Sequence, residues 1–302
     1  MKTLENNNFR KYNWLSSANP ENQVALEFLD RRMNAFYSLP ELRDGYDLLL
    51  ERKGKAIAPE GAEMAFLDWA QNQDFSKVLE VGCGLGWMYN WLRGIRKEIN
   101  YTGVEISEKL TAINKTQWPE AEWLSSSVYD LPLTNESFDL VYSFYVLEHL
   151  VFPIKGLEKM LSLLKPGGRM VLIFPDFISK KNFPSQKLGF GIERTAKEKI
   201  KSGRFMDALL SILDSRIILP FKLNQIKRKP GNFNINIKPL CLEAKPNELW
   251  PDADAVYLAN KVEIEHWAKA HQLSVSYPFS KNGFFSDHAF MVIAKEQVSE
   301  IL

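Results

Sequence analysis

The sequence predicts an α/β protein built on a parallel sheet. Between about residue 76 and residue 176, short apolar runs alternate with helix-like segments, and this alternation is typical of strands joined by right-handed helical crossovers. The first apolar run, Val78–Val81, leads directly into the glycine-rich stretch Gly82–Gly86, which is typical of the tight turn between a buried strand and the next helix. The chain has 302 residues, 45% of them hydrophobic and 25% charged, so one α/β domain with an insertion accounts for its length.

The segment before this alternation, residues 1–75, is expected to be a helical extension. Its first 18 residues are polar and are predicted to be irregular. Asn19 and Pro20 then mark a helix start, because an asparagine side chain caps the first N–H groups and a proline loses no hydrogen bond at the first helical position. Helices are predicted over residues 19–37, 39–50 and 59–70.

Acidic residues lie at the ends of the first two predicted strands. Glu80 precedes the glycine-rich stretch, and Glu105 lies in the short strand Thr102–Ile106, 19 residues beyond Gly86. An acid at this spacing accepts hydrogen bonds from both hydroxyls of a ribose. The pattern therefore predicts a nucleotide-containing cofactor. On this pattern alone, a nicotinamide or flavin enzyme and a purely structural turn remain alternatives.

Three further motifs follow in order. Leu131–Asp139 has the form Leu-Pro-x-x-x-x-Ser-Phe-Asp, Val146–His149 is Val-Leu-Glu-His, and Leu164–Gly168 is Leu-Lys-Pro-Gly-Gly. With the glycine-rich stretch and Glu105, these motifs resemble those of the class I S-adenosylmethionine (SAM)-dependent methyltransferases, in the methyltransferase type 11 branch that includes the ubiquinone-biosynthesis enzymes.

The resemblance covers residues 76–176 closely and residues 257–295 more loosely. It implies a Rossmann-like sheet of seven strands in the order 3-2-1-4-5-7-6, with strand 7 antiparallel. It also implies SAM as the cofactor. The residues expected to bind SAM are Glu80, Gly82, Cys83, Gly84, Gly86, Glu105, Ile106, Ser127, Val128 and Phe144.

Within the implied site, the glycines would admit the methionine half of SAM and Glu80 would reach its ammonium group, directly or through water. Glu105 would hold the ribose, and Ile106 would pack on the adenine. Many relatives carry an Asp-Ala pair where Ser127 and Val128 stand here, so a side-chain carboxylate for the adenine amine is missing and backbone groups near Val128 are the alternative.

Two aromatic residues complete the implied active site. Phe144 would lie near the sulfonium, with core packing as the alternative role. His149 is the candidate general base, because an imidazole titrates near neutral pH; Glu148 beside it would orient it or pair elsewhere. The alternative for His149 is a histidine satisfied by backbone at a helix start. The remaining histidines are expected to be structural: His266, His271 and His288.

After Phe174-Pro175 the alternation of strands and helices stops for about 80 residues. It resumes at Asn260 and Glu263, whose spacing is that of a capping box, and the last strands are predicted over residues 273–277 and 288–294. This divides the chain into a helical N-terminal extension, a SAM-binding core, a helical cap insertion on the acceptor side, and a segment that completes the core sheet: residues 1–75, 76–176, 177–256 and 257–302.

The insertion concentrates positive charge. Residues 177–240 carry a net charge of +10, whereas the whole chain carries +1. The apolar runs Ala208–Leu213 and Ile217–Leu219 lie within the same segment. A basic segment joined to an apolar one is typical of a surface that meets an anionic interface, so an anionic acceptor or a peripheral membrane contact through residues 177–240 is predicted. The alternative is a solvated face on an ordinary helical cap. Nucleic acid is disfavoured because stacking aromatics do not accompany the basic residues.

Cys83 and Cys241 lie far apart in the sequence, which argues against disulfides and zinc. Asp252 and Asp254 have no partner at metal-ligand spacing, so no metal is expected. The chain shows neither a signal peptide nor a membrane-spanning run, so a cytoplasmic protein is expected, with peripheral membrane contact as a further possibility.

The sequence thus predicts a SAM-dependent methyltransferase with a role in biosynthesis. It is expected to act on a small-molecule, glycan or lipid-linked acceptor, with oxygen as the methylated atom. The alternatives are a non-catalytic SAM-binding or interaction protein and, with less support, an NAD-dependent oxidoreductase.

Overall fold

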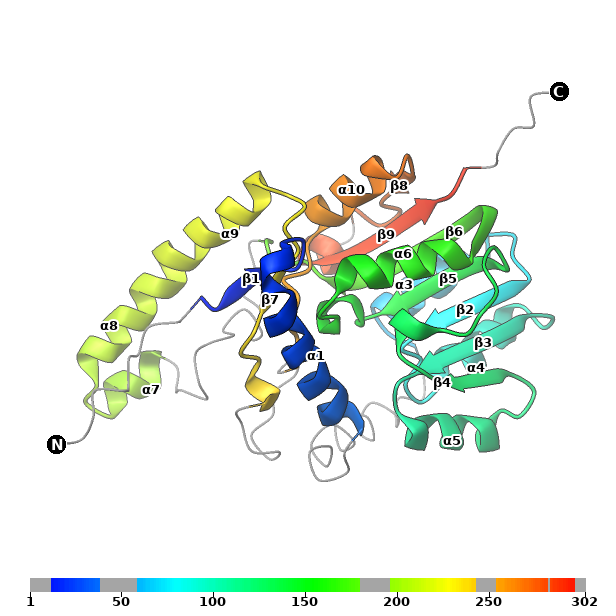
Figure 1. Cartoon of the computed structure of the whole chain (residues 1–302), viewed down its shortest axis with the longest axis horizontal. Helices are drawn as coiled ribbons and strands as arrows, with labels where there is room; N and C mark the ends of the chain where they lie inside the picture. Colours follow the sequence, from blue (N-terminus) through cyan, green and yellow to red (C-terminus); the bar gives the residue numbers. More distant parts are fainter. Residues whose placement is uncertain (1–11, 39–58, 180–195, 243–253, 282, 297–302) are drawn as a thin grey trace.

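The core is a sheet of seven strands in the order β4-β3-β2-β5-β6-β9-β8 (Figure 1). The computed structural model describes residues 12–38, 59–179, 196–242, 254–281 and 283–296. The strands are β2 (Lys77–Val81), β3 (Asn100–Glu105), β4 (Glu122–Ser125), β5 (Phe138–Phe144), β6 (Leu164–Pro175), β8 (Ser274–Ser276) and β9 (His288–Ala294). Strand β9 is antiparallel to both of its neighbours, and the other pairings in the sheet are parallel. The predicted α/β sheet of seven mostly parallel strands is confirmed.

Helices cover both faces of this sheet. One face packs against α3 (Ala62–Ala70) and α4 (Trp87–Ile95), and the other packs against α1 (Gln23–Ser38), α6 (Pro153–Leu163) and α10 (Lys261–Ala270). Helix α5 (Glu108–Gln117) connects β3 to β4. The apolar positions of β2, β5 and β6 are buried on both faces, as expected for central strands of a parallel sheet.

The N-terminal segment corrects one prediction and confirms another. Residues 14–16, expected to be irregular, form strand β1 (Trp14–Ser16), which pairs antiparallel with β7 (Asn234–Asn236) of the insertion. Asn19 caps the following helical turn by accepting a hydrogen bond from the Glu21 N–H, as predicted. The helix predicted over 59–70 begins later, at Ala62, because Gly61 has a φ of +52°. The helix predicted over 39–50 lies outside the described residues.

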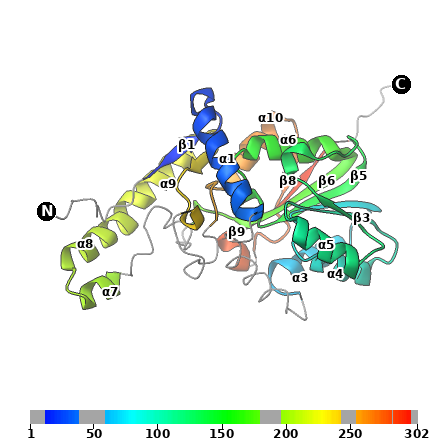
Figure 2. The same ribbon diagram turned by 60° about the horizontal axis from the view of Figure 1, so that its bottom comes forward.

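The longest element of the described insertion is a helical arm. Helix α8 (Phe205–Leu213), a π-helical turn (Asp214–Ile218) and α9 (Leu219–Arg228) follow one another without a break. We call residues 205–228 the arm. It projects away from the sheet in two views, with α7 (Ala196–Lys201) folded against its far end (Figures 1 and 2).

The insertion returns to the core at α10. Asn260 accepts a hydrogen bond from the Glu263 N–H, so the predicted cap is present. The Glu263 carboxylate does not bond back to the Asn260 N–H. It accepts hydrogen bonds from the N–H groups of Gly231 and Phe233 and from the Tyr257 hydroxyl. These bonds fix the end of the arm and β7 to the helix that restarts the core.

Candidate functional site

The glycine-rich stretch forms a tight loop at the carboxyl end of β2. The N–H groups of Gly82 and Cys83 both donate to the Val104 carbonyl, at 2.8 and 2.9 Å. Gly82, Gly84 and Gly86 all have positive φ angles, which side chains adopt only with strain. The loop is therefore tied to β3, and glycine is required at all three of its turning points.

The three glycines differ in what surrounds them. A Cβ atom at Gly82 would lie 2.3 Å from Val146 Cγ2, and one at Gly86 would lie 2.6 and 2.7 Å from Trp118 and Trp123. A Cβ at Gly84 would have no atom within 4 Å. Gly82 and Gly86 therefore admit neighbouring side chains of the protein, whereas Gly84 borders open space that a ligand can enter.

Glu105 lies directly beside this open space. Its Oε2 accepts a hydrogen bond from the Gly84 N–H and its Oε1 accepts one from the Ser107 N–H, each at 3.1 Å. The side chain is buried. Two backbone donors thus fix the orientation of the carboxylate, and Asn114 holds the opposite side of the loop by donating to the Gly84 carbonyl at 2.8 Å.

Glu80 is buried beneath the loop. Its Oε2 accepts hydrogen bonds from the hydroxyls of Tyr101 and Tyr142, the second at 3.0 Å. Burial raises the pKa of Glu80 to about 8, and the two tyrosine hydroxyls only partly oppose this shift. Burial therefore favours the neutral form of Glu80, and its expected contact with the ammonium group of SAM stays a prediction.

The residues expected around the adenine lie at the ends of β3 and β4. Ile106 is half-buried, and Val128 is buried in the core. The Ser127 side chain accepts a hydrogen bond from the Tyr129 N–H, which caps the short helix Val128–Asp130. The Ser126 N–H donates to the Glu105 backbone carbonyl at 3.1 Å, so this segment lies next to the end of β3.

Phe144 ends β5 between two other aromatic rings. Its ring lies edge-on to Phe66 of α3 at 5.2 Å and to Tyr142 at 5.8 Å, measured between ring centroids. It is half-buried, so it both packs on the core and borders the edge of the sheet. The next residue, Tyr145, has a φ of +53°, an uncommon conformation that is concentrated at functional sites.

His149 lies at a junction of three segments. It ends the short helix Leu147–His149, and its Nδ1 lies 3.6 Å from Asp254 Oδ2, while its Nε2 lies 4.0 Å from Glu148 Oε1. The same Asp254 oxygen accepts a 2.8 Å hydrogen bond from the hydroxyl of Tyr37 on α1. Asp254, for which spacing indicated no metal role, thus lies beside the candidate base. Its partners come from the core and the N-terminal helix.

Comparisons with known proteins agree with this geometry. Residues 79–172 match the family model described as a methyltransferase domain. An uncharacterised methyltransferase of Schizosaccharomyces pombe is 28% identical over 154 residues, which cover 47% of this chain and 55% of that protein. The ubiquinone/menaquinone biosynthesis C-methyltransferase of Campylobacter jejuni is 24% identical over 102 residues, which cover 32% of this chain and 43% of that protein.

Residues 79–172 form a class I SAM-dependent methyltransferase domain. The crystal structure of the plantazolicin methyltransferase BpumL, in complex with a desmethylPZN analog and SAH, has the same fold, with a TM-score of 0.52 over 92% of this chain and 98% of that chain at 13% identity. The chain spans about half the length, or less, of the curated relatives named here.

The residues of the methyltransferase domain fit SAM, the cofactor of similar methyltransferases. Gly84 borders open space, and the oriented Glu105 carboxylate lies next to it. Backbone N–H groups and a carboxylate at the end of parallel strands form the polar edge that a nucleoside needs. The sequence did not single out Asn114, Tyr101 and Tyr142, because they are distant in sequence from the residues that they bond. Tyr142 does oppose Glu80 in the register of β2 and β5.

The other histidines make local contacts. His271, which follows α10, has its Nδ1 2.9 Å from the Trp267 carbonyl, and His266 packs near Gly231. His288 Nδ1 lies 2.8 Å from Asp287 Oδ1, and its ring stacks on Phe284. Among the described residues, no group of three or more histidine, cysteine or acidic side chains is arranged to hold a metal ion.

Proposed function

We propose that this chain transfers the methyl group of SAM to an oxygen atom of a small-molecule, glycan or lipid-linked acceptor. The observation that supports this proposal best is the juxtaposition of Gly84 and Glu105 in the methyltransferase domain, where open space meets a carboxylate oriented by backbone. When bound, SAM supplies a methyl group on a sulfonium for direct displacement. The protein's contribution is then to bind, to orient and to accept a proton.

In this proposal Glu105 holds the ribose, and the loop around Gly84 admits the methionine half. Ile106, Ser127 and Val128 border the adenine, with backbone groups replacing the missing side-chain carboxylate. Cys83 is buried and hydrogen-bonded to Asn114, so its contribution is to support the loop. Phe144 borders the reacting end of the pocket.

His149 is the proposed general base. The Asp254 carboxylate lies 3.6 Å from its Nδ1, just beyond hydrogen-bond distance. It would fix the orientation of the ring once this distance shortens with the acceptor bound. Nε2 would then accept the acceptor's hydroxyl proton. Tyr37 restrains Asp254 through its 2.8 Å hydrogen bond, so α1 and the end of the insertion together position the base.

The acceptor is proposed to be anionic or lipid-linked and to be selected by the insertion, with membrane contact through residues 177–240. Two similar proteins show how wide the range of acceptors is: one is a ubiquinone/menaquinone biosynthesis C-methyltransferase, and the other was crystallised with a desmethylPZN analog. None of the helices that the structure describes is long and apolar enough to cross a bilayer.

Cofactor binding and transfer are tested separately. Titration calorimetry with SAH should show binding to the wild type and a loss of affinity of roughly tenfold or more in Glu105→Ala, which removes a charge-assisted acceptor. Glu122→Ala on neighbouring β4, where the carboxylate accepts a 2.9 Å bond from Thr102, is the matched control and should bind SAH normally. Titration with NAD should show no binding.

Transfer is measured with SAM that carries a labelled methyl group, incubated with aqueous and organic fractions of a cell extract. Label in a product of either fraction, lost in His149→Ala, would support an active enzyme and identify the acceptor fraction. SAH binding without transfer to any fraction would favour a non-catalytic SAM-binding protein. Equal SAH affinity in the wild type and Glu105→Ala would contradict the proposed cofactor site.

A further inference from the structure

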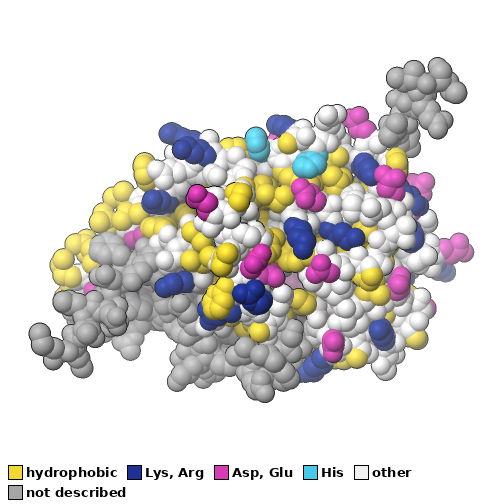
Figure 3. Space-filling view, in the orientation of Figure 1, with side chains coloured by type: hydrophobic (Ala, Val, Ile, Leu, Met, Phe, Trp, Pro, Cys, Tyr) yellow, Lys and Arg dark blue, Asp and Glu magenta, His cyan; other side chains and the backbone are white. Residues whose placement is uncertain are grey.

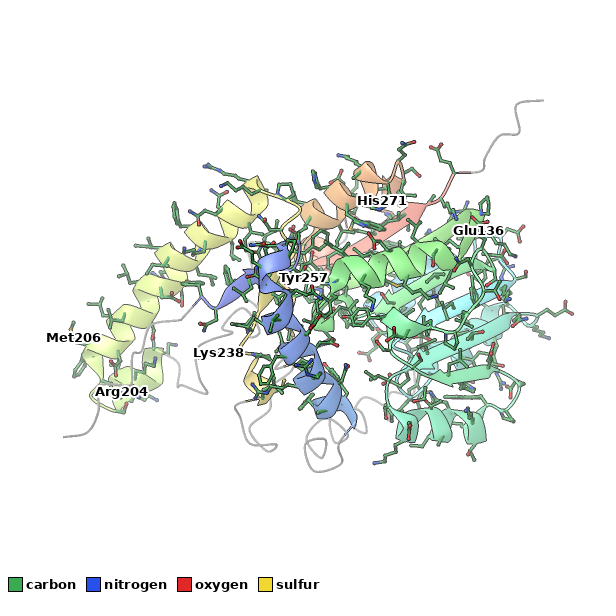
Figure 4. All side chains as sticks on the ribbon, viewed as in Figure 1. Glu136, Arg204, Met206, Lys238, Tyr257 and His271 are labelled. Carbon is green, nitrogen blue, oxygen red and sulfur yellow. The ribbon has the colours of Figure 1, made fainter. Side chains whose placement is uncertain are left out.

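The arm exposes a continuous row of large apolar side chains. Their exposed fractions lie between 41% and 66%, far above those of core residues. They recur at intervals of three or four residues, which places them along one side of a helix. The row consists of Met206, Leu209, Leu213, Ile217 and Phe221, and we call it the apolar row. Figure 3 shows hydrophobic surface gathered along the arm, and Figure 4 places Met206 at its far end.

The opposite side of the arm is the one that packs. The buried side chains of α8 and α9 are Ala208, Leu219, Leu223 and Ile226, and the last three belong to the main hydrophobic core. The arm therefore has a packed apolar side and a second, exposed apolar side. A helix of a soluble domain normally exposes polar groups there, and contiguous apolar patches mark interaction sites.

The exposed charged side chains around the apolar row are mainly lysines and arginines. Exposed basic side chains stand on α7, in the middle of the arm and at the end of α9: Lys197, Lys201, Arg216, Lys227, Arg228 and Lys229. Of the two acidic residues in the arm, one is paired with an arginine and the other is buried. Asp207 accepts a 2.6 Å hydrogen bond from Arg204, and Asp214 is 1% exposed.

Asp214 is held inward by the N-terminal segment. The Tyr12 hydroxyl donates to Asp214 Oδ1 at 2.6 Å, and β1, two residues further on, pairs with β7. Asp214 begins the π-helical turn, which lies in the middle of the apolar row. The acid that would otherwise lie closest to the row is thereby bonded and buried, and the surface beside the row is left cationic.

We propose that the arm is an in-plane docking helix for a bilayer that contains anionic phospholipids. The apolar row would enter the region between headgroups and acyl chains, and the flanking lysines and arginines would contact phosphate groups. Charge complementarity favours this occupant over a second copy of the chain. A symmetric dimer through the row would bring identical cationic surfaces together.

The inference deepens the proposed function, because it makes a membrane-resident lipid the source of the acceptor. It rests on that function only for the identity of the acceptor. Binding of the arm to a bilayer requires neither SAM nor transfer, so the membrane contact and the methyl transfer can fail separately.

The test is co-sedimentation of the full chain with vesicles of phosphatidylcholine alone and of phosphatidylcholine mixed with phosphatidylglycerol, at about 50 and about 500 mM salt. The wild type should bind the anionic vesicles at low salt and lose part of that affinity at high salt. The variant Leu209→Gln/Leu213→Gln/Phe221→Gln should lose roughly tenfold or more in affinity. Lys227→Gln/Arg228→Gln should lose roughly fivefold for each charge at low salt.

Matched controls use similar side chains elsewhere on the surface. Val24→Gln/Phe28→Gln removes exposed apolar groups from α1, and Lys97→Gln/Lys115→Gln removes exposed cations from the core side; both should bind vesicles as the wild type does. SAH calorimetry on every variant shows whether the cofactor site has remained folded.

Three outcomes would overturn the inference while SAH binding is intact. The first is no sedimentation with anionic vesicles at low salt. The second is wild-type binding by the apolar-row variant. The third is a dimer in light scattering that this variant dissociates, without vesicle binding, which would assign the apolar row to a second copy of the chain. Vesicle binding without methyl transfer would leave the inference standing and overturn the proposed function.

Discussion

The Tyr142 hydroxyl donates a 3.0 Å hydrogen bond to Glu80 Oε2, and the two residues are register partners on β5 and β2. Tyr101 on the other neighbouring strand donates to the same oxygen. An acid at the end of the first strand thus lies between two tyrosines rather than at the surface. Its carboxyl group connects three strands immediately beneath the glycine-rich loop.

Glu80→Gln should change how stability depends on pH. The folded-state pKa of Glu80 is raised to about 8 by burial, above the ordinary value of 4.5, so its contribution to stability is fully present below pH 4.5 and is lost as pH rises through 8. The neighbouring Glu105 carboxylate also raises the pKa of Glu80 and so opposes its ionisation. Burial raises the pKa values of Cys83 and Tyr101, so these two neighbours stay neutral in this range. Urea unfolding should therefore show the variant gaining on the wild type by about 1–3 kcal/mol between pH 5 and pH 9. A constant difference across that range would contradict the prediction.

Alanine substitutions at the three loop glycines should have different effects. Each places a side chain at positive φ, at a cost of about 1–2 kcal/mol. Gly82→Ala and Gly86→Ala also clash with Val146 and with the two tryptophans, adding about 1–3 kcal/mol of overpacking. Gly84→Ala meets no neighbouring atom, so thermal unfolding should show it as the most stable of the three.

SAH affinity should show the reverse order, with Gly84→Ala affected most. We expect this variant to bind SAH roughly tenfold more weakly than the wild type, although it loses the least stability, because the added methyl enters the ligand's space. Calorimetry is measured well below the melting temperature of each variant. Normal SAH affinity in Gly84→Ala would place the cofactor away from this loop.

Asp139 should stabilise the protein above about pH 4. Partial burial raises its pKa, but hydrogen bonds from Lys165, from both N–H groups at the start of β2 and from the Ser76 hydroxyl outweigh burial and lower the pKa to about 2. A lowered pKa gives stability that is present above pH 3.8 and lost as pH falls towards 2. Asp139→Asn should cost about 1–2 kcal/mol at pH 7, since Lys165 is partly exposed to solvent. The difference from wild type should shrink towards pH 2 in urea titrations, and a difference that widened there would rule out this role.

Asp254→Asn should slow the reaction without weakening cofactor binding. The amide keeps the size of the side chain but loses the charge that would stabilise protonated His149, 3.6 Å away. With the acceptor fraction identified above, kcat should fall by roughly tenfold or more while KM for SAM stays near the wild-type value. Tyr37→Phe removes the other partner of Asp254 and should have a smaller effect in the same direction. A change confined to KM would assign Asp254 to binding instead.

Local patterns in the sequence determined most of the core. The run Val78–Val81, the glycines after it and the strand-end Glu105 predicted a strand, a turn and a second strand, and all three are present. Residues 288–294 form a strand with the predicted bounds. These elements are predictable because backbone freedom at glycine, apolar runs and helix caps act over a few residues.

Tertiary structure alone decided which distant residues meet. Strand β1 exists because it pairs with β7, more than 200 residues later, and its three residues are too few to predict a strand by themselves. Asp254 lies beside His149, and Glu80 accepts bonds from two tyrosines, because strands and loops far apart in sequence converge at one edge of the sheet. The sequence placed apolar and basic residues in one segment, but only packing determined that Leu223 is buried while Leu209 and Phe221 are exposed. Helical periodicity defines the sides of a helix, and the contacts made by the rest of the chain determine which side faces the solvent.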